Sequence, residues 1–251
     1  MEPKFLINEP VLFIEKLKAI VIADLHIGIE HELAKNGIKI PNQMPLMLKK
    51  IKSALRKTKS KNLIVLGDIK HQVPGINFFE QKEIPSFFEQ LKKMCQIKIC
   101  IGNHDTFIKD LIPNEIEVYD SKGFAMENYG FFHGHAWPDK NLMSCDYLIT
   151  SHIHPTLLFT DKLGHRIIEP VWIKSYLKND KIKEKYKIEV KGKIEMIVLP
   201  AFNKLLSGSN INALNLKYDF IEPLMADIMD MKKTELYLLD GTFIGRLSDI
   251  K

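Results

Sequence analysis

Cysteine is scarce in this sequence, which holds three among 251 residues: Cys95, Cys100 and Cys145. The number is odd and no CxxC pair occurs, which argues against a disulfide framework and a cysteine-based zinc site and favours a reducing compartment. No apolar run reaches the roughly 18 residues of a membrane span, and the opening residues lack the apolar core of a signal peptide. We therefore expect a cytoplasmic protein with no membrane contact.

A strong excess of one charge is also missing. Lysine and arginine number 36 against 31 acidic residues, and the net charge of +5 favours anionic partners only weakly. Arginine is limited to Arg56, Arg166 and Arg246, so bidentate reading of DNA bases is not expected. The GxSxG, Walker A and GxGxxG patterns are absent, which leaves serine hydrolysis, nucleotide switching and dinucleotide redox chemistry without support.

Apolar runs typical of buried strands occupy residues 18–23, 62–66 and 97–101. Amphipathic stretches at 44–55 and 85–94 separate them and predict helices. Strand, helix, strand, helix, strand indicates parallel strands joined by right-handed crossovers. Ligands of such sheets gather at the carboxyl ends of the strands.

The sequence after residue 115 is dominated by strand patterns. They lie at residues 117–120, 124–132, 146–150, 166–176, 194–199 and 235–246, the last with a hairpin turn at Asp240 and Gly241. No linker or repeat divides the chain. We predict an α/β fold in one domain, 1–251, with two mixed sheets packed face to face and helices on the outside, the second sheet being completed by residues 156–251.

Polar side chains capable of binding metal stand where these strands end. They are Asp24, His26, Asp68, Asn103, His133, His152 and His154. Seven nitrogen and oxygen ligands are too many for one tetrahedral zinc, and they suit two adjacent ions that share a carboxylate. The D-x-H and H-x-H spacings fit this interpretation, because residues i and i+2 of an extended or turning segment point the same way.

The order of these motifs resembles the calcineurin-like metallophosphoesterase superfamily, whose pattern is D-x-H, GD, GNH(D/E), H and H-x-H, each after a strand. All motifs fall within residues 20–155. The resemblance implies the α/β sandwich of that superfamily and two metal ions. One would be held by Asp24, His26, Asp68 and His154, and the other by Asp68, Asn103, His133 and His152, with Asp68 bridging. His135 would then lie beside the ligands or face the substrate.

Two positions vary this pattern. Ser151 stands where the last motif usually has glycine, which leaves the ligand spacing intact. His71, three residues after Asp68, resembles the SbcD-type DNA-repair nucleases, in which that histidine assists with the DNA substrate. The patterns at 199–202 and 207–210 look like those of archaeal SbcD-related and bacterial DNA ligase-associated phosphoesterases. This resemblance implies a nucleic-acid substrate.

The predicted chemistry is hydrolysis of a phosphodiester. Two ions about 3.5–4 Å apart lower the pKa of a bridging water, so that a hydroxide attacks phosphorus. His104 is the expected proton donor to the leaving oxygen, and Asp105 is expected to orient its imidazole. We expect Mn²⁺ in both sites, with iron, zinc, cobalt or nickel as alternatives.

Three functions remain open at this point. The first is a sequence-nonspecific nuclease for single-stranded or damaged DNA, and the second is a phosphatase or diesterase for a small nucleotide or a phosphoprotein. The third, a non-catalytic scaffold, is disfavoured because the ligand set is complete. The lysine-rich stretches 49–61 and 178–193, a helix face and an expected hairpin, could contact DNA phosphates or simply face solvent. We interpret His31 and His165 as ordinary surface or partly buried residues.

Overall fold

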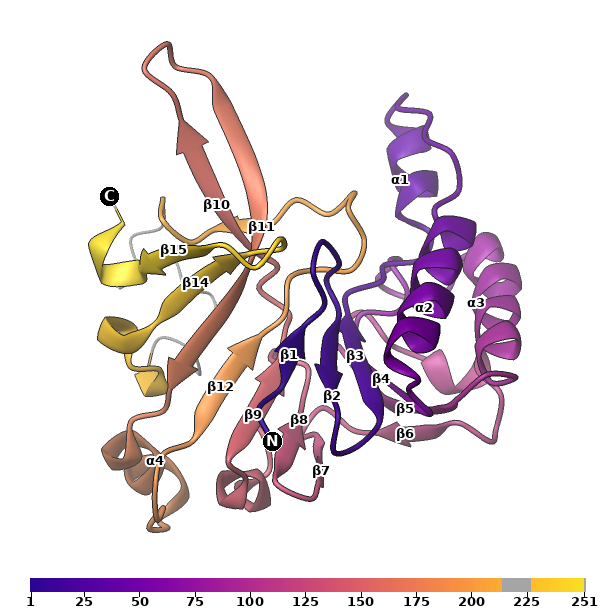
Figure 1. Cartoon of the computed structure of the whole chain (residues 1–251). Helices are drawn as coiled ribbons and strands as arrows, with labels where there is room; N and C mark the ends of the chain where they lie inside the picture. The colour runs from indigo at the N-terminus through magenta and orange to yellow at the C-terminus, as the bar shows by residue number, and fades with distance from the viewer. Residues whose placement is uncertain (214–226, 251) are drawn as a thin grey trace.

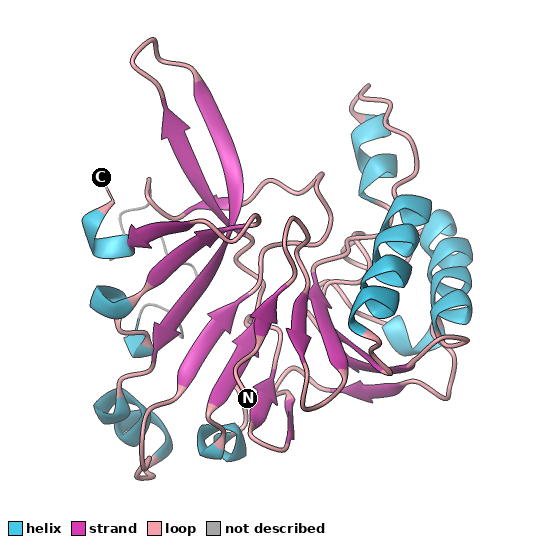
Figure 2. Ribbon diagram, in the orientation of Figure 1, coloured by secondary structure: helices cyan, strands magenta, loops and turns pink. Residues whose placement is uncertain are grey.

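The computed structural model describes residues 1–213 and 227–250 and contains two β-sheets that face each other (Figures 1 and 2). The first sheet has the order β1-β2-β3-β4-β5-β6, antiparallel from β1 to β3 and parallel from β3 to β6. Its strands are β1 Lys4–Phe5, β2 Leu12–Ile14, β3 Ala19–Ala23, β4 Asn62–Leu66, β5 Gln96–Cys100 and β6 Glu117–Tyr119.

The second sheet is also mixed, with the order β13-β10-β11-β12-β9-β8-β7 and with β14 and β15 joined through β11. Its strands are β7 Phe124–Met126, β8 Tyr129–Phe131, β9 Tyr147–Thr150, β10 Pro155–Thr160, β11 Arg166–Tyr176, β12 Glu195–Val198, β13 Ser209–Asn210, β14 Glu235–Leu238 and β15 Phe243–Arg246. The strands β8, β9 and β12 run parallel, so their carboxyl ends lie at one edge.

Two of the α-helices cover the outer face of the first sheet (Figure 2). The α-helices are α1 Ile29–Lys35, α2 Met44–Thr58, α3 Phe78–Leu91 and α4 Asn179–Tyr186, and short 3-10 turns lie at Ile108–Asp110, Lys140–Ser144, Met231–Lys233 and Leu247–Asp249. Among the described residues, no helix is long and apolar enough to cross a bilayer.

Side-chain alternation along the first sheet divides the core into two layers. On β3, Ile20 and Ile22 pack with the apolar faces of α2 and α3, while Val21 and Ala23 pack with residues of the second sheet. The layer between the sheets includes the buried Trp172, which stacks on Phe5 with ring centroids 4.4 Å apart. The predicted fold class is therefore confirmed.

The structure corrects several predicted elements. Residues 178–193 form α4 and a following loop instead of a hairpin, because lysines and glutamates at helical spacing bury Ile182 on one face. The helix predicted at 85–94 begins at Phe78 and contains Pro85. The elements β1, β2, α1, β10 and β13 were not predicted. The strand at 166–176 and the hairpin formed by β14 and β15 are confirmed.

Candidate metal centre

The candidate ligands meet where the parallel strands of both sheets end. Asp24 and His26 follow β3, and Asp68 follows β4. On the other sheet, His133 comes two residues after β8, while the pair His152 and His154 follows β9. Each sheet thus contributes three of these side chains to one place at the seam between the sheets.

One cluster contains Asp24, His26, Asp68 and His154, whose possible ligand atoms all lie within 4.8 Å of one another. His154 Nε2 lies 3.4 Å from Asp24 Oδ1, and His26 Nε2 lies 3.4 Å from Asp68 Oδ2. Both carboxylates are almost fully buried. This is the grouping expected for the first metal ion.

A second cluster contains Asp68, His133 and His152, again within 4.8 Å. His133 Nε2 lies 3.4 Å from Asp68 Oδ2 and 3.0 Å from His152 Nδ1. Asp68 belongs to both clusters and lies where a bridging ligand would be needed. Asn103 lies in the exposed turn after β5, next to His104, whose backbone N–H donates to Asp68 Oδ1 at 2.9 Å.

The backbone at these positions is unusual. Asp24, His26, Asp68, His152 and His154 all have positive φ, between 40° and 73°. Residues with a Cβ seldom adopt this region, and such conformations cluster at functional sites that the surrounding fold holds in place. The D-x-H and H-x-H segments are therefore tight turns that direct both side chains of each pair into the centre.

Glycines make room for the shared carboxylate. A Cβ on Gly102 would overlap Asp68, and a Cβ on Gly67 would overlap the imidazole of His133. These close approaches give a steric reason for the glycine in the GD and GNH motifs.

The donor set fits divalent transition metals. Two carboxylates and four imidazoles form a nitrogen and oxygen site that suits manganese, iron, cobalt or zinc. Asp24 Oδ1, His26 Nε2 and His154 Nε2 are buried, and among the described residues they make 3.4 Å contacts within the cluster and no well-formed hydrogen bond. Buried polar atoms are normally paired, so these atoms are positioned for a cation.

Electrostatics in the metal-free chain agree with this assignment. Burial alone would raise the pKa values of Asp24 and Asp68, but His154 and His133 respectively hold both below the usual range. Burial would lower the pKa of His133, yet the carboxylates of Asp68 and Asp24 raise it to about 9. Burial and the neighbouring His133 lower the pKa of His152 to about 4. His133 in the metal-free cluster therefore holds a proton that would have to leave when a metal binds.

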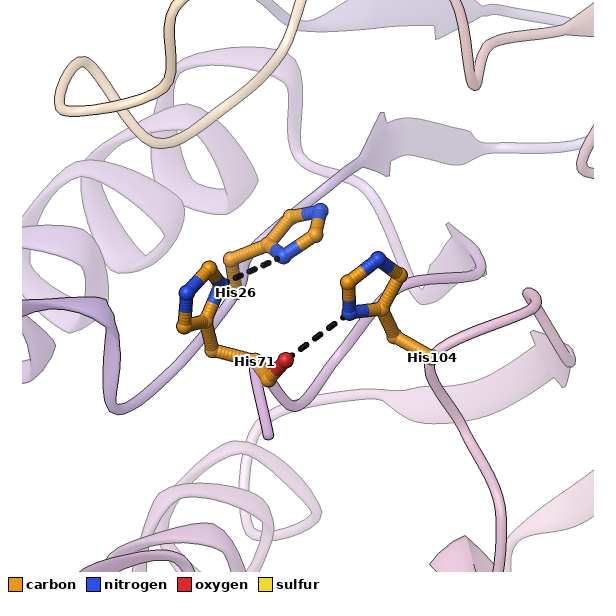
Figure 3. A group of neighbouring side chains, drawn as sticks. All are labelled: His26, His71 and His104. Carbon is orange, nitrogen blue, oxygen red and sulfur yellow. Dashed lines mark hydrogen bonds between the residues drawn. The ribbon is translucent and has the colours of Figure 1, made fainter. Parts of the chain in front are cut away.

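A third group contains His26, a member of the first cluster, together with His71 and His104 (Figure 3). His26 Nδ1 and His71 Nδ1 are 3.1 Å apart, and His71 Nε2 lies 2.9 Å from Glu32 Oε2. His104 Nδ1 donates to the backbone carbonyl of His71 at 2.8 Å. His71 therefore contacts a candidate ligand directly, which the sequence motif did not reveal.

Asp105 has a different contact from the one expected. Its Oδ1 accepts the N–H of Ile69 at 2.7 Å, and its Oδ2 accepts the N–H of Gly102 at 2.8 Å. The expectation that Asp105 orients the His104 imidazole is wrong, because Asp105 lies beneath the turns after β4 and β5 and holds their backbones together. Burial, with the nearby Asp68, raises the pKa of Asp105 to about 6.

His135 lies beside the second cluster and outside its ligand set. Its ring centroid is 5.3 Å from that of His133 and 5.9 Å from that of His152. Burial and the proximity of His133 lower its pKa to about 4. That His135 contacts the substrate stays a prediction.

Two buried charges that sequence reasoning missed shape the loop after Asp68. Lys70 is fully buried and its ammonium donates to the carbonyls of Gln72 and Gly75. Glu80 Oε1 accepts the N–H groups of His71 and Gln72 at 3.0 and 2.7 Å. Glu80 also forms a capping box with Asn77 at the start of α3, and the Asn-x-x-Glu spacing could have indicated it.

The segment 199–210 contacts the turns that carry the first and the last candidate ligands in the sequence. Asn203 Nδ2 donates to the carbonyl of Leu25 at 2.8 Å, and Ser209 N donates to the carbonyl of His154 at 3.0 Å. A Cβ at Gly208 would overlap that same carbonyl. The tail pattern seen in the sequence therefore supports the turns that carry the first and last ligands.

The lysine-rich stretches lie along α2 and at the amino-terminal edges of the two sheets. Residues 49–58 belong to α2, which covers the outer face of the first sheet. Lys61 N donates at 2.8 Å to the carbonyl of Lys18, directly before β3, so 57–61 lies at the amino-terminal edge of the first sheet. The helix α4 precedes β12, whose amino end is at the corresponding edge of the second sheet (Figure 1). Neither stretch surrounds the clusters, which lie at the carboxyl edge.

Comparisons with known proteins identify the fold. The calcineurin-like phosphoesterase family model matches residues 17–222. Pseudomonas putida nuclease MPE has a TM-score of 0.56 at 19% identity, over 95% of this chain and 96% of that chain. E. coli Yfce, a phosphoesterase, has a TM-score of 0.36 at 13% identity, over 57% of this chain and 73% of that one. A predicted phosphoesterase of Streptococcus pneumoniae TIGR4 has a TM-score of 0.30 at 13% identity, over 72% and 96%. Among curated protein sequences no match is found.

The family model covers most of the chain, including both strand groups that carry the candidate ligands. The two clusters of histidine and aspartate agree with a hydrolase that uses divalent metal ions. The chain therefore belongs to the calcineurin-like phosphoesterase family and is a metal-dependent hydrolase.

Proposed function

We propose that this protein is a phosphodiesterase with two metal ions that cleaves DNA without sequence preference. The observation that carries the proposal is the sharing of Asp68 between two clusters of ligand atoms. In this proposal one ion is held by Asp24, His26, Asp68 and His154, and the other by Asp68, Asn103, His133 and His152. Mn²⁺ is the ion we expect, because the imidazole-rich set suits Mg²⁺ poorly.

The metal ions would supply a water of lowered pKa and would neutralise the phosphate oxygens. The chain itself would supply the proton for the leaving oxygen. A carbonyl can only accept, so the bond to His71 O requires that His104 Nδ1 carry its hydrogen. This fixes the ring and leaves Nε2 for proton transfer when the imidazole is protonated.

Two observations support a nucleic acid as substrate. His71 occupies the position three residues after Asp68 that resembles SbcD-type nucleases, and its Nδ1 lies 3.1 Å from Nδ1 of His26, a candidate ligand. The Pseudomonas putida protein with a similar fold is itself a nuclease. Because arginine is scarce, hydrogen bonds that distinguish one base edge from another are not expected. The strand would instead be bound through its backbone and by stacking on the flat faces of its bases.

A small nucleotide or a phosphoprotein is the second candidate substrate. It is favoured by residues 57–61 and 178–193, the lysine-rich segments at the opposite edge from the clusters, which do not extend a phosphate track from them. A small phosphodiester would need the centre alone.

The deciding experiment compares substrates under one set of conditions. We would incubate the protein and Mn²⁺ with linear and circular DNA, single- and double-stranded, and with bis-p-nitrophenyl phosphate, cyclic nucleotides and a phosphopeptide. We expect cleavage of single-stranded DNA and of the aryl diester, and loss of both in Asp68→Ala and in chelator. Absence of DNA cleavage alongside rapid turnover of a nucleotide or phosphopeptide would replace the proposal with the second candidate.

A further inference from the structure

A cavity of about 500 Å³ lies between α1 and the start of α3, next to the candidate metal centre. Its lining includes Gly28, His31, Lys35, His71, Phe78 and Phe79. His71 connects the two places, since it lines the cavity and its Nδ1 lies 3.1 Å from His26 Nδ1. A ligand in this cavity would therefore be adjacent to a group bound at the metals.

The cavity presents aromatic rings to solvent. Phe78 is 74% exposed and Phe79 is 44% exposed, although large apolar side chains are normally covered. The imidazole of His31 stacks on the ring of Phe79, with centroids 3.5 Å apart and planes 10° apart. This stacking fixes the orientation of the Phe79 ring before any ligand arrives.

The polar part of the cavity is also rigid. Gln72 and Asn77 belong to the lining, and Glu80 Oε1 and Oε2 accept their backbone N–H groups at 2.7 and 2.9 Å. Glu80 itself is fully buried. A preformed site loses little conformational entropy when it binds a ligand.

We propose that this cavity binds a nucleobase of the strand whose phosphodiester is held at the metal centre. The inference rests on the proposed function and specifies its substrate as unpaired nucleic acid. A base has a flat π face that stacks on Phe79 or Phe78 and a polar edge that the Gln72 side-chain amide and the Nδ2 of Asn77 can contact, since Asn77 Oδ1 already accepts the N–H of Glu80. Stacking accepts every base, in agreement with the scarcity of arginine. A base within a duplex is already stacked and cannot enter without unpairing.

The test replaces the aromatic rings and separates binding from chemistry. Phe79→Leu and Phe78→Leu remove an aromatic ring but keep an apolar side chain, whereas Phe79→Trp keeps a ring. Phe243→Leu is the matched control, because Phe243 is 53% exposed on β15, in the other sheet. We would measure KM and kcat with Mn²⁺ for a single-stranded oligonucleotide and for bis-p-nitrophenyl phosphate. Oligonucleotide KM should rise about 5- to 150-fold in Phe79→Leu and should recover in Phe79→Trp. Aryl diester turnover should be unchanged in all four variants.

A binding measurement in chelator gives a second readout. Fluorescence anisotropy should show tighter binding of the normal oligonucleotide than of one with abasic sites, and Phe79→Leu should remove that difference. If the wild-type protein cleaves DNA but both leucine variants keep its KM, the cavity proposal is wrong and the nuclease proposal stands. An equal loss on the aryl diester would also overturn the base site, because the substitutions would then act on the metal centre. If the wild-type protein cleaves no nucleic acid, both proposals fail together.

Discussion

His71 and His26 face each other through their Nδ1 atoms, 3.1 Å apart, and His71 Nε2 lies 2.9 Å from the carboxylate of Glu32. A carboxylate accepts a hydrogen, so a neutral His71 carries its hydrogen on Nε2 and accepts through Nδ1. His26 must then donate from Nδ1, which leaves the lone pair on Nε2 directed toward Asp68. The chain of Glu32, His71 and His26 thus selects the tautomer of His26 that can bind a metal.

His71→Ala should therefore weaken metal binding as well as catalysis. Loss of such an outer partner typically lowers metal affinity about 10- to 100-fold. Titration of Mn²⁺ into chelator-treated protein measures this, with His165→Ala on the exposed β10–β11 hairpin as control. Unchanged Mn²⁺ affinity together with impaired DNA cleavage would instead assign His71 to the substrate.

His104→Ala should leave metal content unchanged and should slow hydrolysis about 10²- to 10⁴-fold where the leaving alkoxide needs a proton. The loss should be much smaller with p-nitrophenolate as leaving group. Steady-state rates on DNA and on bis-p-nitrophenyl phosphate provide the comparison. Equal losses on the two substrates would exclude His104 as the proton donor.

Ser151→Ala tests the residue that stands in place of the usual glycine. The Ser151 hydroxyl donates to Asp24 Oδ2, and both side chains are fully buried. Removing a hydrogen bond to a charged group should lower the free energy of unfolding of the metal-free protein by about 1.5–3 kcal/mol. Urea denaturation in chelator measures the change, and Ser144→Ala, whose residue lies on an exposed turn, is the control. Wild-type stability in Ser151→Ala would show that the contact contributes nothing.

Metal binding should release a proton from His133. Its pKa of about 9 means that the metal-free imidazole is protonated near neutral pH, whereas a ligand must be neutral. Mn²⁺ affinity should therefore rise with pH up to about 9. In the metal-free chain, the stability gained from the protonated form is present below the ordinary histidine pKa and is lost as the pH rises to about 9. Calorimetric titration in buffers of different ionisation enthalpy counts the protons, and binding without release would contradict the assignment.

Much of the fold was predictable because its signals are local. The strands predicted at 18–23, 62–66 and 97–101 are apolar runs followed by polar turns, and the structure ends them at Ala23, Leu66 and Cys100, within one residue of the prediction. The lysine and glutamate spacing of α4 was misread as a hairpin, since its single buried residue, Ile182, gives a weak apolar pattern. The helix α1 has only seven residues, and one of its buried residues is the charged Glu30, so its sequence shows no apolar helical pattern.

The site divides in the same way. The short motifs predicted that seven side chains gather at one edge, and six of them lie in the two clusters there, because parallel strands bring their carboxyl ends together. The outer contacts were not predictable, since they join residues distant in sequence: Glu32 with His71, Ser151 with Asp24, and Asp105 with Ile69. Phe78 and Phe79 gave no signal, because only their exposure in the folded chain distinguishes them from core residues.

Because the centre lies between the two sheets, its ligands are synthesised in two separate groups. The first sheet supplies Asp24, His26 and Asp68, whereas His133, His152 and His154 leave the ribosome later. The strand β12, which lies between β9 and β11, is later still. A nascent chain that ends before His133 offers an incomplete ligand set for either ion. Both candidate ligand sets are therefore complete only once the chain has been made as far as His154, and the second sheet that carries three of these ligands is completed only after β12.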